Sequence, residues 1–192
     1  MKGVNIFIAD GFEDCEALAV NDVLRRGGVE SRLVSISDSE FVRSSHGVTV
    51  KADCLLNSLL AVPSNRAAGS EDFMIFPGGM PGSRNLAACK SLIEEMKRHY
   101  ADGGSLAAIC AAPGLVLSQL EELSGLRFTC FDGFQDNLEP KGATFIEAPA
   151  VVCGRVITGR SAGHAISFGL EILKKIKGEE KAAQVSHAMY LK

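Results

Sequence analysis

The sequence contains no apolar run long enough to cross a membrane and no basic run of the kind that binds nucleic acid. Its formal net charge is −3, and its isoelectric point is near 5.8. Its six cysteines form no CxxC pair, and Met1-Lys2-Gly3 leads directly into a strand pattern instead of a signal peptide. We therefore expect a cytoplasmic protein with reduced thiols, no metal site, no nucleic-acid partner and no membrane association.

The chain also lacks internal repeats, low-complexity tracts and a linker between domains. It has 192 residues, of which 46% are apolar and 22% are charged, as in an ordinary soluble globular protein. This length is enough for one sizeable hydrophobic core and short for two. The sequence predicts a single domain over residues 1–192.

Strand and helix patterns alternate along the chain. Apolar runs predict strands at residues 4–9, 31–36, 73–76, 105–109 and 126–130, and a hairpin around Cys153-Gly154-Arg155 within 143–158. Periodicity and capping residues predict helices at residues 13–26, 91–101, 163–176 and 179–186, with a further helix opening at Ala112. In the helix at 91–101, Leu92, Ile93 and Met96 are expected to face inward, and Glu94, Glu95, Lys97 and Arg98 outward. Such alternation favours an α/β fold with a mostly parallel sheet covered on both faces.

Two segments fall outside this alternation. Residues 41–53 predict a short β-arm that turns at Ser44-Ser45-His46-Gly47. Residues 55–72 are weakly patterned and loop-like, particularly around Pro63 and Ser64-Asn65.

Cys110 stands where a buried strand gives way to a helix. The strand Ser105–Ile109 is apolar, and Pro113 suits the first turn of the helix that follows. A reactive side chain on a tight turn between strand and helix is the arrangement of a nucleophile elbow, in which free N–H groups favour a thiolate. A small buried cysteine of the core fits the same pattern, and this stretch alone does not separate the two readings.

Two other strand ends carry unusual chemistry. Glu16 heads an apolar stripe of its helix formed by Val20, Val23, Leu24 and Gly27, so it is expected to point inward with a raised pKa. The alternative is a solvated first-turn acid. Gly78-Gly79 follows another strand and lets backbone N–H groups approach a developing negative charge, although Pro-Gly-Gly is also an ordinary turn. A nucleophile, an acid and amide donors together suit attack on a carbonyl carbon.

The sequence resembles the ThiJ/PfpI superfamily, on the branch of the human parkinsonism-associated protein deglycase and the bacterial ThiJ/YajL proteins. The matching stretches follow the family order over essentially the whole chain. They are Ala9-Asp10-Gly11-Phe12-Glu13-Asp14-Cys15-Glu16, Asp22-Val23-Leu24-Arg25-Arg26-Gly27-Gly28, Phe76-Pro77-Gly78-Gly79-Met80-Pro81-Gly82, Ala108-Ile109-Cys110-Ala111-Ala112-Pro113 and Ile157-Thr158-Gly159-Arg160-Ser161-Ala162-Gly163.

This resemblance implies a flavodoxin-like three-layer α/β sandwich and a homodimer. It implies that Cys110 is the reactive cysteine and that a protonated Glu16 donates a hydrogen bond to its sulfur. The N–H groups around Gly78, Gly79 and Ala111 are implied as the oxyanion hole. The implied activity is a cofactor-free glyoxalase or deglycase reaction on methylglyoxal, glyoxal or their protein adducts. The alternative is a redox-sensing protective protein or chaperone that responds through oxidation of Cys110.

Other functions of the superfamily fit less well. A cysteine peptidase is disfavoured because Ala111 follows Cys110 where peptidase-like members carry histidine. The family's older label, thiamine thiazole biosynthesis, finds no phosphate-binding loop or metal cluster here.

Four auxiliary residues come from the same comparison. Cys130 stands where the human relative has a histidine, and it is either a resolving thiol or a core cysteine. His46 is either a dimer contact on the β-arm or, preferably, a solvated turn residue. Arg160 and His164 are candidates for the rim of the pocket, while His99 and His187 are expected to be structural.

Overall fold

The computed structural model describes residues 1–62 and 67–191, so Pro63, Ser64 and Asn65 of the predicted loop lie outside the described residues. A seven-stranded sheet with the order β10-β11-β7-β6-β1-β2-β5 forms the middle layer. Every neighbouring pair is parallel except β10 and β11, which form the predicted antiparallel hairpin. The strands are β1 (Val4–Ile8), β2 (Ser31–Ser35), β5 (Cys54–Leu55), β6 (Phe73–Phe76), β7 (Ser105–Ile109), β10 (Ala150–Cys153) and β11 (Val156–Gly159).

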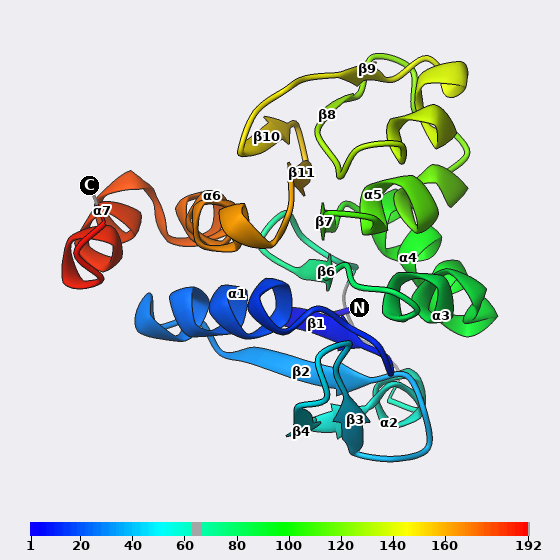
Figure 1. Cartoon of the computed structure of the whole chain (residues 1–192), viewed down its shortest axis with the longest axis horizontal. Helices are drawn as coiled ribbons and strands as arrows, with labels where there is room; N and C mark the ends of the chain where they lie inside the picture. Colours follow the sequence, from blue (N-terminus) through cyan, green and yellow to red (C-terminus); the bar gives the residue numbers. More distant parts are fainter. Residues whose placement is uncertain (63–66, 192) are drawn as a thin grey trace.

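Helices cover both faces of this sheet, so the predicted three-layer α/β sandwich is confirmed (Figure 1). On one face lie α1 (Asp14–Arg26), α6 (Ala165–Lys177) and α7 (Glu179–Ala188). On the other lie α2 (Leu56–Leu60), α3 (Gly82–Ala88), α4 (Lys90–Ala101) and α5 (Ala112–Leu115). Alternate strand residues supply the two cores: Ile6 and Ile8 face α1 and α6, while Phe7 stacks on Phe76 on the other side.

Two small sheets complete the fold. The predicted arm is present as β3 (Phe41–Arg43) and β4 (Thr49–Lys51), which pair antiparallel. The expected strand at 126–130 is shorter: β8 (Arg127–Phe128) pairs with β9 (Thr144–Phe145) outside the main sheet. The interpretation of 55–72 as loop was wrong in part, because β5 and α2 fall inside it. Helix α3 was not predicted. Within residues 1–62 and 67–191, no helix combines the length and apolar character needed to cross a membrane.

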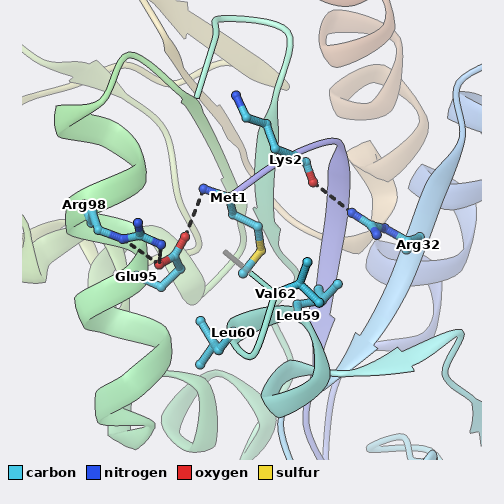
Figure 2. Close-up of a pocket in the computed structure, with 8 residues that line it drawn as sticks. All are labelled: Met1, Lys2, Arg32, Leu59, Leu60, Val62, Glu95 and Arg98. Carbon is cyan, nitrogen blue, oxygen red and sulfur yellow. Dashed lines mark hydrogen bonds and ion pairs between the residues drawn. The ribbon is translucent and has the colours of Figure 1, made fainter. Parts of the chain in front are cut away.

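The amino ends of the strands carry a buried polar cluster that corrects one prediction. Glu95 was expected on the outer face of its helix, but it is 5% exposed. Figure 2 shows its carboxylate between the Met1 amine, 2.9 Å away, and the Arg98 guanidinium. These groups line a cavity of about 440 Å³ together with Lys2 and Arg32 and the apolar Leu59, Leu60 and Val62. Periodicity did not foresee the ion pairs that make this carboxylate tolerable inside.

His99 joins segments at the same edge of the sheet, in keeping with the structural role that the sequence predicts. Its ring is buried, and Nε2 lies 3.1 Å from the Asp72 carbonyl oxygen and 3.0 Å from that of Ser105. A Cβ on Gly104 would lie 2.5 Å from its Cδ2 and closer still to Nε2. The backbone at Gly104 therefore has no room for a side chain unless the imidazole moves.

We expect Gly104→Ala to lower the free energy of unfolding by about 2 kcal/mol, because the added methyl overpacks this site and displaces His99 from its carbonyl partners. Urea unfolding monitored by circular dichroism measures the change. Gly163→Ala is the matched control, since a Cβ there meets nothing within 4 Å. Equal stabilities of the two variants would contradict the prediction.

Candidate active site

The carboxyl ends of three adjacent strands, β1, β6 and β7, bring the predicted site together. Cys110 directly follows β7 and has a φ of 65°, a left-handed conformation that is rare for residues other than glycine. Two main-chain hydrogen bonds hold it: its N–H donates to the Gly159 carbonyl at 3.0 Å, and its carbonyl accepts from the Phe131 N–H at 2.9 Å. The strained turn places a partly exposed thiol at the edge of the sheet.

Glu16 lies on the buried face of α1, as its stripe predicted, and is 0% exposed. The side chain of Glu13 caps the helix by accepting the Glu16 N–H at 2.8 Å. Glu16 Oε2 in turn accepts the N–H of Gly78 at 2.6 Å. The solvated alternative is therefore wrong.

Burial raises the pKa of Glu16 to about 7, against the lowering effect of hydrogen bonds from the Cys110 thiol and the Gly78 N–H. A carboxyl group with this pKa exchanges a proton readily at neutral pH.

Gly78 allows the carboxyl and the thiol to meet. A Cβ on Gly78 would lie 2.6 Å from the Cβ of Cys110 and closer still to Glu16 Oε2, so any side chain would separate the two. Because the Gly78 N–H is used by Glu16, its place in the predicted oxyanion hole needs revision: in this structure it positions the acid. The N–H groups of Gly79 and Ala111 remain, and both lower the pKa of the Cys110 thiol.

The surroundings of Cys110 shift the pKa of its thiol in both directions. Burial above all, and then the charge and hydrogen bond of Glu16, raise its pKa to about 12, although the Ala111 and Gly79 N–H groups lower it. Two acidic groups in one partly desolvated space do not both ionise easily. An ionised Glu16 therefore disfavours the thiolate, and the expected thiolate beside a protonated Glu16 stays a prediction.

The structure places the auxiliary residues Cys130, Arg160 and His164 in different surroundings. Cys130 is 0% exposed and packs in the core under α3–α5, and burial raises its pKa to about 12, which favours the core-cysteine interpretation over a resolving thiol. Arg160 donates to the Cys130 carbonyl at 2.6 Å and to Asp132 at 2.5 Å. His164 directly precedes α6, and its buried Nδ1 has no hydrogen-bond partner among the described residues. Its role at the pocket rim stays a prediction.

His46 sits in the β3–β4 turn beside the start of α1. Its Nδ1 lies 2.8 Å from Asp14 Oδ2 and 4.0 Å from Glu13 Oε1, and its side chain is 68% exposed. One ligand atom from each of these three residues lies within 4.8 Å of the others. Glu13 already caps α1, and Asp14 already accepts the Ser44 hydroxyl, so we assign no metal to this cluster. The contact of His46 with a partner subunit stays a prediction.

Sequence reasoning missed the groups that act through their main chain. Phe131 and Gly159 fix the backbone of Cys110, and Glu13 caps the helix of Glu16. No residue pattern marks a carbonyl or an N–H group, so only the pairing of β7 with β11 and the return of the chain at residue 131 reveal them.

Comparisons with known proteins cover the whole chain. A model of the DJ-1/PfpI family matches residues 2–175. Protein DJ-1 homolog A of Arabidopsis thaliana is 36% identical over 191 residues, which is 100% of this chain and 47% of that protein. The glutathione-independent glyoxalase DJR-1.2 of Caenorhabditis elegans is 32% identical over 169 residues, which is 88% of this chain and 85% of that protein. This chain spans less than half the length of the two Arabidopsis relatives that it matches.

Solved structures show the same likeness. The crystal structure of a DJ-1 superfamily protein from Salmonella typhimurium superimposes with a TM-score of 0.88 at 29% identity, covering 100% of both chains.

We expect burial of Glu16 to appear as a pH dependence of stability. Its pKa of about 7 in the folded chain exceeds the ordinary value of 4.5, so the folded state binds the proton more tightly. The resulting stabilisation is complete below the unfolded pKa and is lost as the pH rises through the folded pKa. Relative to Glu16→Gln, the wild type is expected to lose about 3 kcal/mol of unfolding free energy between pH 4.5 and pH 7.

Urea unfolding of both proteins across this range measures the difference. The matched control is Glu94→Gln, an exposed acid on α4 that is expected to run parallel to the wild type. Parallel curves for Glu16→Gln and the wild type would contradict burial of a titrating carboxyl.

Proposed function

The chain belongs to the DJ-1/PfpI family, and from that premise we propose that it is a cysteine-dependent, glutathione-independent glyoxalase. The proposed substrates are methylglyoxal, glyoxal or the adducts that they form on proteins. The observation that carries the proposal is that Glu16 and Cys110 meet at Gly78, where an added Cβ would lie 3.1 Å from Cys110 Sγ and closer still to Glu16 Oε2. A nucleophile, a general acid–base with a pKa of about 7 and an oxyanion hole are what addition to an aldehyde requires.

The first step is addition of sulfur to the aldehyde carbon. The Glu16 carboxylate takes the thiol proton as Cys110 Sγ bonds to that carbon, so the high pKa of the resting thiol is no obstacle. The aldehyde oxygen becomes an oxyanion, which the Gly79 and Ala111 N–H groups stabilise. Proton transfer from Glu16 to this oxygen completes a hemithioacetal and returns the carboxylate.

The second step is an internal proton shift. The carboxylate removes the proton from the former aldehyde carbon, and the neighbouring ketone oxygen takes up a proton, giving an enediol. Glu16 then returns a proton to the neighbouring carbon while the hydroxyl group on the former aldehyde carbon releases its own, so one proton has moved between the carbons and one between the oxygens. The product is a thioester, which water hydrolyses to the 2-hydroxy acid and free Cys110. Overall, methylglyoxal and water give lactate, so the carbon oxidised and the carbon reduced are in one molecule. The proposed reaction therefore needs no external reductant or cofactor.

A specific relative supports this activity over the alternatives, since one protein 32% identical to this chain is named a glutathione-independent glyoxalase. A redox sensor depends on a readily formed thiolate, because oxidation follows thiolate character. The raised pKa of Cys110 is unfavourable for that role. A peptidase activity is disfavoured because Ala111 follows Cys110, at the position where peptidase-like members of the superfamily carry a histidine.

We expect the wild type to convert methylglyoxal to lactate catalytically, and Cys110→Ser and Glu16→Gln to lower kcat/KM by about 100-fold or more, as loss of a nucleophile or general base does. Enzymatic assay of D- and L-lactate gives turnover and stereochemistry together. Gly78→Ala is expected to fail similarly because its Cβ separates the two groups, whereas Gly163→Ala retains activity. No wild-type turnover would overturn the proposal for this substrate, and a peroxide titration of Cys110 would then test the sensor.

We also propose that the chain works as a homodimer in the cytoplasm. Phe41 on β3 and Val48 in the turn before β4 are 63% and 49% exposed, and a second copy of the chain would cover this apolar surface. Sedimentation equilibrium at micromolar concentration is expected to give twice the chain mass, and Phe41→Ser is expected to weaken the association. A wild-type monomer would contradict the dimer.

A further inference from the structure

The left-handed conformation of Cys110 depends on two segments that are distant in sequence. One is the end of β11, whose Gly159 carbonyl accepts the Cys110 N–H. The other follows β8, where the Phe131 N–H donates to the Cys110 carbonyl. A non-glycine residue keeps such a strained backbone only where its surroundings fix it. The position of the sulfur is therefore decided by whatever holds these two segments together.

Two side chains join them: the Thr158 hydroxyl on β11 accepts the Thr129 N–H at 2.9 Å, and Arg160 makes several further contacts. It directly follows β11, and its main-chain N–H donates to the Pro149 carbonyl at 3.0 Å. Its guanidinium donates from Nη1 to the Cys130 carbonyl at 2.6 Å and from Nη2 to Asp132 at 2.5 Å. These two partners stand immediately before and after Phe131. The guanidinium of Arg160 therefore binds the segment 130–132 on both sides of the Phe131 N–H that donates to Cys110.

The guanidinium is itself held in place. Its carbon lies 5.1 Å from the centroid of the Phe145 ring on β9, and the side chain is 19% exposed. Asp132 is 81% exposed, so that ion pair is screened by water and contributes little. The hydrogen bond to the Cys130 carbonyl and the stacking on Phe145 are the contacts that fix the arginine.

We propose that Arg160 is a positioning residue for the nucleophile: by holding residues 130–132 against the end of β11, it keeps Cys110 in its left-handed turn with the sulfur against Glu16. This role deepens the proposed function, but it concerns the geometry of the thiol and is testable without any substrate. Arginine suits the role because its fork donates in two directions while its face stacks, which lysine does not reproduce.

Arg155 provides a matched control at the opposite end of the same strand. Its Nη1 donates to the carbonyls of Tyr100, at 2.9 Å, and Gly104, and its guanidinium carbon lies 4.2 Å above the Tyr100 ring. It therefore makes the same kinds of contact as Arg160. These contacts lie at the amino end of β11, whereas Cys110 lies at the carboxyl ends of the strands.

The test measures how strongly the Glu16 carboxyl group affects the reactivity of the Cys110 thiol. Alkylation of Cys110 by iodoacetamide is followed peptide by peptide with mass spectrometry at neutral pH, with Cys89 as the reference within each molecule. Because Glu16 raises the pKa of Cys110, Glu16→Gln is expected to speed this alkylation about tenfold in the wild-type background, as a shift of one pKa unit does. In the Arg160→Ala background the same substitution is expected to change the rate less than about twofold.

The controls separate positioning from general destabilisation. Arg155→Ala is expected to lower the melting temperature as Arg160→Ala does, yet to keep the full effect of Glu16→Gln. Asp132→Asn is expected to keep it as well, and Arg160→Lys to keep part of it, which preserves the test if Arg160→Ala fails to fold. An undiminished effect of Glu16→Gln in Arg160→Ala, or in Arg160→Lys if only that variant folds, would overturn the proposal. Absence of glyoxalase turnover would leave this measurement intact, so the two proposals fail separately.

Discussion

Burial of Glu16 beside Cys110 places two acidic groups in a space that tolerates one negative charge, and the surrounding structure is arranged around that conflict. Desolvation raises both pKa values, and the charge of the carboxylate raises that of the thiol further. The hydrogen bond from the Gly78 N–H offsets part of the cost of burying the carboxyl. Gly78 is essential to this arrangement because any side chain there would occupy the space in which the two groups meet.

The fold creates this contact by joining elements that are far apart in sequence. Glu16 comes from the helix after β1, Gly78 from the turn after β6 and Cys110 from the turn after β7, and these three strands are neighbours in the sheet. The end of the next strand, β11, supplies the carbonyl that fixes Cys110 and the arginine that holds residues 130–132. The site is thus the carboxyl edge of the parallel sheet, where α/β folds generally bind ligands.

The sequence predicts most of this because the main signals are local. The apolar stripe of α1 places Glu16 inside, and the buried strand before Cys110 places the thiol on a strand-to-helix turn. The same periodicity places Glu95 outside, which is wrong, because its position is decided by ion pairs with Arg98 and the Met1 amine that no periodicity encodes. Short elements such as β5 and α2 were missed since their stability comes from tertiary packing and not from their own pattern. The backbone partners of Cys110 leave no trace in residue type at all.

Cys130 stands where the resemblance to the human relative implies a histidine, which raises the question of which group moves protons here. The Cys130 thiol is buried in the core, and the carbonyl of the same residue is engaged by Arg160, so this position contributes to the site through its backbone. Glu16 is then the titratable side chain that interacts with the sulfur, and the proposed chemistry requires it to take and return every proton. A carboxyl group with a pKa of about 7 suits both directions equally, because neither its acid nor its base form is scarce at neutral pH. The proposed chemistry therefore depends on the distance between Glu16 and Cys110, and the main-chain hydrogen bonds of Cys110 to Gly159 and Phe131 are the contacts that fix the position of the sulfur.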